Sequence, residues 1–307
     1  MLVYLNGKLV PGEEAKVSVF DHGLLYGDGV FEGIRAYGGN IFRLHEHIQR
    51  LYESAKTIAL TVPLSPEDLV RATVQTVAAN GMRDAYIRLV VSRGEGDLGI
   101  DPDNCRKPTL FIIVHKIKLY PPEFYVKGIS LVTASTRRVP MECLDPRIKS
   151  LNYLNNILAK IEAKKAGVPE AIMLNLSGRV AECTADNIFI FRNGGLKTPS
   201  LTEGALPGVT RGAVLELARQ IGWTAEEPRL GLYDVYNAEE CFLTGTGAEI
   251  VPVISVDGRT IGNGRPGERT RDLMQRFKEL READGVKVTY PGPVARIASN
   301  ARKGARA

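Results

Sequence analysis

Apolar and polar positions along the chain follow two different patterns, which predict strands in some segments and helices in others. Short apolar segments flank Asn6-Gly7 and predict an N-terminal hairpin, because this dipeptide favours a two-residue turn. A first helix is predicted by apolar residues at helical spacing, namely Leu44, Ile48, Leu51, Ala55 and Ile58. A second helix is expected from the capping residue Ser65 to about Gly81.

Strand-like runs are more numerous than helical ones and come in clusters. Strands are expected at 30–37, 86–92, 109–116, 129–134, 171–175, 179–183, 187–192 and 240–244. Further helices are expected after Lys149, with Leu154, Ile157, Leu158 and Ile161 on one face, and after Gly208, with Val214, Leu217, Ala218 and Ile221. Because strands and helices do not alternate strictly, the predicted fold class is α+β, with partly antiparallel sheets and a meander over 171–192.

The segment Tyr120-Pro121-Pro122 interrupts both patterns and divides the predicted elements into two halves. We therefore expect a smaller N-terminal α+β domain over residues 1–119 and an interdomain linker over 120–130. A larger C-terminal domain would follow over 131–290, and residues 291–307 would form a basic tail.

Composition and charge exclude several classes of protein. The length of 307 residues, with 44% hydrophobic and 24% charged residues, is typical of a globular enzyme-sized protein. The apolar runs have strand length and the N-terminus lacks a secretory signal, so we expect no membrane span and a cytoplasmic location. The net charge of +5 is modest, and no aromatic residues interleave with the basic tail, so a nucleic-acid partner is not expected.

Two features match binding motifs but lack the context that those motifs require. Residues 94–99 match the GxGxxG pattern of dinucleotide-binding proteins, but Pro102 interrupts the helix that should follow. His45 and His47 stand two residues apart on a predicted helix and would point to different faces. The four cysteines are scattered without a metal-ligand spacing, so no metal site is expected.

Five other features together suit an anionic cofactor with a basic ring. Glu182 places an acid on a strand, and the Gly208-Val209-Thr210 turn places amides at a helix N-terminus, where phosphate binds well. Gly245-Thr246-Gly247 offers a second turn of amides, and Arg50 can add a charge-assisted bond. Lys149, just ahead of a helix, supplies an amine. This set is what pyridoxal 5'-phosphate requires of a protein.

The spacing within the same region carries a resemblance. The pattern Glu182-x-Thr184-x-x-Asn187-Ile188-Phe189, then Leu196-x-Thr198, then Leu206-x-Gly208-Val209-x-Arg211 resembles the signature of class IV (fold type IV) pyridoxal-phosphate-dependent aminotransferases. The similarity extends to about residue 290 and is strongest to branched-chain amino acid aminotransferases. It implies the two-domain fold of the D-amino acid aminotransferase-like enzymes, with the cofactor bound by the larger domain.

The resemblance also implies roles for individual residues toward the cofactor. Lys149 would be the catalytic Schiff-base lysine, and Glu182 would pair with the protonated pyridine nitrogen. Tyr153 would bond the ring hydroxyl, although the family often has one more residue between the lysine and this tyrosine. Leu206 would lie against the ring. The phosphate would be held by Arg50, Gly208, Val209, Thr210 and Thr246.

For the substrate, the resemblance implies an apolar pocket bounded by Tyr26, Phe31, Gly33 and Tyr86. Arg35 and Arg88 would assist with carboxylates, and the amides of Thr246 and Gly247 would receive the α-carboxylate. Gly247 is a departure, because close relatives often carry alanine there. In this family Tyr26 commonly reaches the site of the neighbouring subunit, so the partner expected for the chain is at least one further copy of itself, as a homodimer.

The function expected from these residues is ping-pong transamination of leucine, isoleucine and valine with 2-oxoglutarate, with Lys149 moving the proton. A D-amino acid transaminase is an alternative, but its Arg-x-His carboxylate triplet is absent, since His115 has no arginine two residues upstream. An aminodeoxychorismate-lyase-like enzyme of the same fold is a second alternative. A nicotinamide-nucleotide binder is a third, from a different class.

Overall fold

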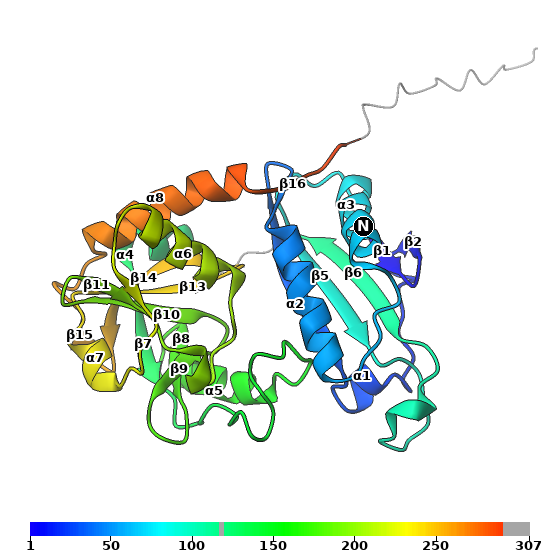
Figure 1. Ribbon diagram of the computed structural model, residues 1–307, viewed down its shortest axis with the longest axis horizontal. Helices are drawn as coiled ribbons and strands as arrows, with labels where there is room; N and C mark the ends of the chain where they lie inside the picture. Colours follow the sequence, from blue (N-terminus) through cyan, green and yellow to red (C-terminus); the bar gives the residue numbers. More distant parts are fainter. Residues whose placement is uncertain (117–119, 291–307) are drawn as a thin grey trace, which may run out of the picture.

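The computed structural model describes residues 1–116 and 120–290, which form two sheets with helices packed on them (Figure 1). Every strand pair in the first sheet is antiparallel. Its strand order is β16 (Gly285–Lys287), β4 (Asn40–Phe42), β3 (Gly29–Tyr37), β5 (Ala85–Ser92), β6 (Thr109–His115), β1 (Leu2–Leu5) and β2 (Lys8–Pro11).

The second sheet is mixed. Its order is β12 (Ala225–Glu226), β11 (Gly195–Lys197), β10 (Asn187–Arg192), β13 (Glu240–Gly245), β14 (Glu249–Val256), β7 (Ile129–Thr133), β8 (Glu170–Leu174) and β9 (Val180–Cys183), with β15 (Arg259–Thr260) paired to β14. Strand β7 is parallel to both of its neighbours, β11 and β12 are parallel, and the remaining pairs are antiparallel. The prediction of an α+β fold with partly antiparallel sheets is confirmed.

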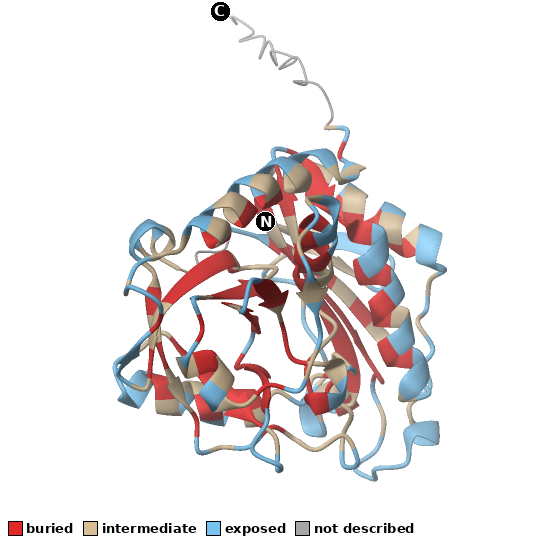
Figure 2. Ribbon diagram, turned by 60° about the vertical axis from the view of Figure 1, so that its left-hand side comes forward, coloured by how far each residue is buried: buried red, intermediate tan, exposed pale blue. Residues whose placement is uncertain are grey.

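The helices cover the sheets, and the central strands are mostly buried, whereas short strands such as β2, β15 and β16 are more exposed (Figure 2). None of the helices in the described part of the chain is long and apolar enough to cross a membrane. They are α1 (His22–Leu25), α2 (Leu44–Thr57), α3 (Pro66–Ala79), α4 (Pro122–Lys127), α5 (Leu154–Lys165), α6 (Val209–Gln220), α7 (Leu232–Tyr236) and α8 (Glu268–Ala283), with 3-10 turns at Pro102–Asn104 and Leu201–Glu203.

Four apolar clusters hold these layers together. One joins α2 and α3 to the first sheet, around Leu44, Leu51 and Ile87. A second lies on the second sheet beside α4 and α7, and a small one joins α5 to β8. The fourth packs α6 and α8 on the other face of the second sheet and also includes Tyr37 and Phe42 of the first sheet. This last cluster fixes the two sheets relative to each other.

Local signals in the sequence explain why several elements form where they do. The Asn6-Gly7 turn joins β1 and β2 in the expected hairpin, with Leu5 opposite Lys8. Ser65 caps α3 by accepting a hydrogen bond from the Asp68 amide at 3.1 Å. The strand predicted before Lys149 and the helix predicted after it are also present, as β7 and α5.

One expectation about the second sheet is wrong, and the helix α5 packs on it in an unusual way. Residues 171–192 do not form a continuous meander, because β10 pairs with β11 and β13 and not with β9. The apolar face of α5 is not buried on the sheet: Leu154 is 68% exposed and Ile157 is 51% exposed. The small residues Ala159 and Ala163 face the sheet instead, so the close contact selects small side chains and not large ones.

The domain boundaries remain a prediction. Strand β16, from the segment assigned to the larger domain, pairs with β4 of the first sheet. The predicted basic tail at 291–307 lies outside the described residues, as do residues 117–119 beside the predicted linker.

Candidate active site

A cavity of about 590 Å³ lies where the two sheets meet. The first sheet and α2 contribute Phe31, Gly33, Arg50, Tyr86 and Arg88. The remaining predicted residues that line it come from the second half of the chain, namely Lys149, Tyr153, Glu182, Leu206, Gly208, Val209, Thr210, Thr246 and Gly247. The fold thus brings residues from distant parts of the sequence into one cavity.

Lys149 stands on an irregular segment that the first sheet holds in place. The Phe31 amide donates to the Lys149 carbonyl at 3.0 Å, and the Leu151 amide donates to the Gly29 carbonyl at 2.9 Å. The Lys149 amide donates to Ser54 Oγ at 3.1 Å. The backbone is thereby held at three points, and the Lys149 side chain lines the cavity.

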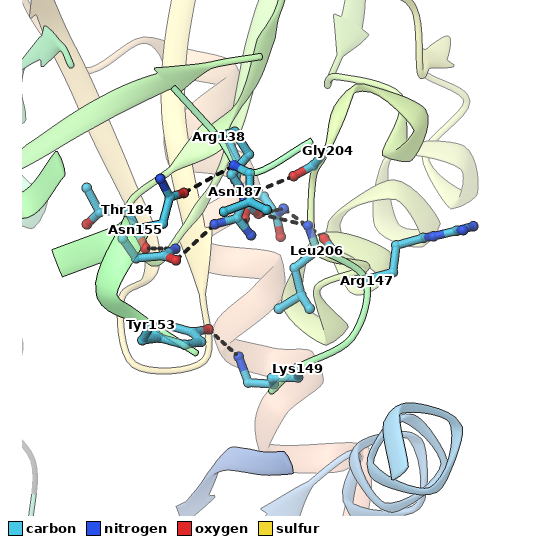
Figure 3. A network of polar contacts seen from close by, with 12 residues as sticks. Arg138, Arg147, Lys149, Tyr153, Asn155, Thr184, Asn187, Gly204 and Leu206 are labelled. Carbon is cyan, nitrogen blue, oxygen red and sulfur yellow. Dashed lines mark hydrogen bonds and ion pairs between the residues drawn. The ribbon is translucent and has the colours of Figure 1, made fainter. Parts of the chain in front are cut away.

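The lysine amine is surrounded by aromatic groups. Lys149 Nζ lies 3.2 Å from Tyr153 Oη, a contact drawn in Figure 3, and 4.7 Å from the centre of the Phe31 ring. The Phe31 and Tyr153 rings meet edge to face at 5.0 Å. The tyrosine therefore lies beside the lysine even though the sequence has one residue fewer between them than is common in the family.

Glu182 lies on the opposite side of the cavity, at the end of β9, and is buried. Its Oε1 pairs with Arg138 Nη2 at 2.8 Å, and its Oε2 accepts from the Leu206 amide at 2.9 Å and from Asn187 Nδ2 at 3.1 Å. Burial raises the pKa of the Glu182 carboxyl, and Arg138 partly offsets that rise. A carboxylate has about four acceptor positions, so three bonds leave room for about one more donor.

An anion-binding corner lies between α2 and α6. Arg50 donates twice to Glu32, at 2.7 Å each, and once to the Pro207 carbonyl at 2.8 Å. Three of the five N–H donors of the guanidinium are thereby used, and two remain toward the cavity. The amides of Val209 and Thr210 open α6, where helix geometry leaves them without a partner in the helix.

Gly208 is required at this corner by a close approach. Its φ is ordinary, but a Cβ at this position would overlap Asn187 Oδ1. The Asn187 amide in turn donates to the Leu206 carbonyl at 3.0 Å, which ties the strand β10 to the turn before α6. The spacing of the motif thus reflects one hydrogen-bonded unit built from Glu182, Asn187 and the Leu206–Gly208 turn.

The second turn, at 245–247, backs onto a buried acid. Asp186 is packed so closely under Gly245 that a Cβ there would overlap its Oδ1. Asp186 also accepts a hydrogen bond from Tyr120 Oη at 3.2 Å. Burial, together with the charge of Glu170, raises the pKa of Asp186 to about 7.

This pKa predicts a pH-dependent cost to stability. Because the folded-state pKa is raised above the ordinary value of 3.8, the contribution of Asp186 is most favourable below that value and is lost as the pH rises through about 7. Asp186→Asn should therefore be more stable than wild type by up to about 4 kcal/mol at pH 8, with the gap closing toward pH 4. Urea unfolding at both pH values measures it. Asp272→Asn, in an exposed pair on α8, should show no such gap.

Phe31, Gly33, Tyr86 and Arg88 of the first sheet line one side of the cavity. Arg88 stacks over Phe31 at 4.5 Å and donates to Tyr86 Oη at 3.0 Å. Gly33 leaves the space that the Tyr86 hydroxyl occupies, since a Cβ at this position would overlap it. Two aromatic rings and one cation therefore bound the side of the cavity that faces Lys149.

Two predicted substrate residues do not line this cavity. Tyr26 is 40% exposed, and its hydroxyl donates to the Leu98 carbonyl at 2.6 Å. Arg35 lies behind the 245–247 turn, with Nη1 3.5 Å from the Gly247 carbonyl and Nη2 3.9 Å from Glu249. Within one chain, Arg35 can support the turn but does not reach into the cavity.

Several residues that line the cavity were not predicted from the sequence. Asn156, Tyr120, Glu170 and Asp186 line the cavity, and Arg138 contacts Glu182 from behind it. Lys160 on α5 also lines the cavity, and its Nζ binds the Pro169 carbonyl at 2.6 Å and Glu170 at 3.0 Å. Asp186 belongs to the motif segment and could have been identified there, whereas nothing in the local sequence marks Arg138.

The residues present fit pyridoxal 5'-phosphate. Lys149 offers an amine, Glu182 retains about one acceptor position for a ring N–H, and Arg50 and the α6 amides offer donors for a phosphate. Among the described residues, no group of three or more histidine, cysteine, aspartate or glutamate side chains is arranged to hold a metal ion.

Arg50→Ala tests the anion-binding corner. The variant should raise the dissociation constant for the cofactor by about 10- to 100-fold, because a charge-assisted contact to the phosphate is lost. It should also lose about 3 kcal/mol of stability, since the buried Glu32 would keep only its hydrogen bond with His47. Fluorescence titration of the apoprotein measures the first effect. Arg71→Ala, at an exposed pair on α3, is the control, and cofactor affinity unchanged in Arg50→Ala would remove Arg50 from the corner.

Comparison with known proteins agrees with this geometry. The family model described as amino-transferase class IV matches residues 29–256. A Methanocaldococcus jannaschii protein, provisionally named a branched-chain-amino-acid aminotransferase, is 54% identical over 94% of this chain and 99% of its own length. The branched-chain-amino-acid aminotransferase of Escherichia coli K12 is 37% identical over 90% of this chain and 91% of its own length.

Solved structures give the same result. A crystal structure of the Escherichia coli branched-chain amino acid aminotransferase superposes with a TM-score of 0.89 at 36% identity and covers 91% of this chain and 94% of that one. A T.th. branched-chain amino acid aminotransferase with pyridoxamine 5'-phosphate superposes with a TM-score of 0.88 at 38% identity, over 92% and 94% of the two chains. The chain therefore belongs to the class IV aminotransferase family, whose cofactor is pyridoxal 5'-phosphate.

Proposed function

We propose that the protein transfers the amino group of leucine, isoleucine and valine to 2-oxoglutarate. The observation that carries this proposal is that the Lys149 amine lines one cavity together with Glu182 and the Phe31 and Tyr86 rings. An apolar side chain can pack on those rings while the α-carbon lies near the amine. The branched-chain names of the similar proteins support the same substrate class.

Each residue has a part that follows from its position. When bound, the cofactor supplies the electron sink for the bonds at the substrate α-carbon. Lys149 Nζ, once neutral, takes the proton from that carbon and returns it later, as a general base and then a general acid. Glu182 accepts the ring N–H, and Tyr153 orients the ring through its hydroxyl. Arg50, Val209, Thr210 and the Thr246 turn hold the phosphate in place.

The carboxylate groups of the substrates need their own partners. The amides of Thr246 and Gly247 are proposed to receive the α-carboxylate, and Arg88 to receive the second carboxylate of 2-oxoglutarate. Arg88 reaches this position because Phe31 and Tyr86 hold its guanidinium from two sides. Asp186, which lies beneath the same turn, favours substrate binding in its protonated form, since a negative charge there repels a carboxylate.

A substrate panel separates this proposal from the two alternatives in the same fold. Steady-state rates with 2-oxoglutarate should be highest for the three branched-chain L-amino acids and near background for D-alanine. Preference for D-alanine would identify a D-amino acid transaminase. Release of pyruvate from aminodeoxychorismate without an acceptor would identify the lyase alternative.

We also propose that the active unit is a homodimer in the cytoplasm. Large apolar side chains are exposed on two segments that both lie along the lower edge of Figure 1, namely α5 and the segment around α1. Leu154 and Ile157 stand on the first, and Val19, Leu24 and Tyr26 on the second. A second copy would bury these faces and bring Tyr26 toward its partner's cavity. Sedimentation should give twice the chain mass of 33.6 kDa, and a monomer would contradict the proposal.

A further inference from the structure

Arg138 is buried next to Glu182, and the roles proposed above do not account for its position. It lies on the irregular segment between β7 and Lys149 and is only 8% exposed. Its guanidinium is fixed on three sides: Nε donates to the Gly204 carbonyl at 3.1 Å, Nη1 to Asn156 Oδ1 at 3.0 Å, and Nη2 pairs with Glu182 at 2.8 Å. Figure 3 shows this network next to the lysine and tyrosine of the cavity.

The network is anchored at its far side as well. Asn156 Nδ2 donates to the Thr184 carbonyl at 2.7 Å, so the amide cannot turn away from Arg138 without losing a second bond. Asn156 thereby connects α5 to the turn that follows β9. The guanidinium is held by neutral groups on two sides, and Glu182 is the one anion with which it forms an ion pair in the described part of the chain.

We propose that Arg138 is a positioning residue that keeps the Glu182 carboxylate ionised and aimed into the cavity, so that the shared proton stays on the cofactor ring nitrogen. This inference rests on the proposed function, in which Glu182 accepts the ring N–H. Arg138 does not touch the cofactor in this account, and its effect passes through one oxygen of Glu182.

The charges around Glu182 give the direction of the effect. Burial raises the pKa of the Glu182 carboxyl, and Arg138 is the largest influence that lowers it, ahead of the Leu206 amide, Lys149 and Arg211. Without Arg138, the buried carboxylate would be a stronger base. It would then hold the shared proton itself, and the ring nitrogen would become neutral and a weaker electron sink.

A purely structural role for Arg138 makes a different prediction. In that case, replacing Arg138 would lower stability and cofactor affinity but leave the ring nitrogen protonated in whatever enzyme remained folded. The protonation state of the ring nitrogen separates the two roles, because it responds to the charge beside Glu182 and not to packing.

The test uses the holoenzyme loaded with ¹⁵N-labelled pyridoxal phosphate. The ¹⁵N chemical shift of the ring nitrogen is followed with pH in wild type, Arg138→Gln and Arg138→Lys. Wild type should show a protonated nitrogen throughout the range in which it is folded. Arg138→Gln should show the chemical shift of a neutral ring nitrogen at neutral pH. In Arg138→Lys, the ring nitrogen should lose its proton at a higher pH than in Arg138→Gln.

The outcomes are decisive even if one variant fails. A ring nitrogen that stays protonated in Arg138→Gln overturns the proposal. If Arg138→Gln does not fold, Arg138→Met takes its place because it also removes the charge, and a ring nitrogen that stays protonated in that variant overturns the proposal. Glu182→Gln tests the proposed function on which this inference rests. If the ring nitrogen also stays protonated in that variant, the assignment of Glu182 fails, and not only that of Arg138.

Discussion

Lys149→Ala is expected to reduce turnover by at least about 10⁴-fold, the largest effect of any single substitution in this protein. The covalent attachment of the cofactor and the movement of the α-proton both depend on the same amine, so a single change removes both. The fold should survive, because the backbone of residue 149 is held by Phe31 and Ser54 and not by the lysine side chain. Initial rates with L-leucine and 2-oxoglutarate measure the loss.

Lys165→Ala is the matched control, since this lysine is exposed at the end of α5. It should keep wild-type rates. A circular dichroism melt of Lys149→Ala separates loss of chemistry from loss of fold. Wild-type-like activity in a correctly folded Lys149→Ala protein would exclude Lys149 from the reaction.

Glu182→Gln is expected to keep the cofactor bound and to reduce kcat on the order of 100-fold. Glutamine keeps one acceptor oxygen, so it can still accept from either Arg138 or the Leu206 amide, which bond different oxygens of Glu182 in wild type. It cannot stabilise a positive charge on the ring nitrogen as a carboxylate does. Pre-steady-state absorbance with L-leucine would show binding at an ordinary concentration followed by slow chemistry.

Glu226→Gln, at an exposed ion pair with Lys197, provides the comparison for the loss of one carboxylate. It should leave both binding and kcat unchanged. If Glu182→Gln instead lost the cofactor and kept its kcat when the cofactor was supplied in excess, Glu182 would be a binding residue and not an electronic one.

Much of the candidate site could be predicted from the sequence because its residues lie at the ends of strands and at the start of a helix. Glu182 is at the end of a strand, Gly208 and Thr210 are at a helix start, and the 245–247 turn follows a strand, so each was identified from local pattern and spacing. The structure also gives a reason for the spacing of the motif, since Asn187 connects Glu182 to the turn at Leu206.

Other features could not be predicted because they depend on contacts between distant segments. Arg138 lies in a stretch without periodicity, and its partners Gly204 and Asn156 are far from it in the sequence. The position of Lys160 at the cavity depends on Glu170, which reaches it only when β8 packs beside α5. The outward apolar face of α5 has the same periodicity as a buried one, so pattern alone could not distinguish them.

The arrangement of the sheets explains how one fold supplies both halves of the site. The first sheet and α2 provide the aromatic pocket, Arg88 and Arg50, while the second sheet and α6 provide Glu182 and the α6 amides. Tyr37 and Phe42 of the first sheet pack into the apolar cluster of α6 and α8. The relative position of the two halves, and so the distance across the cavity, therefore depends on apolar packing outside the site.

The most direct test of the proposed function is the visible absorption spectrum of the purified holoenzyme before and after addition of L-leucine and, separately, of D-alanine. We predict that L-leucine alone removes the absorption band of the cofactor joined to Lys149, and that 2-oxoglutarate restores it. A response to D-alanine and not to L-leucine, or the lack of any cofactor band after pyridoxal phosphate has been added, would contradict the proposal.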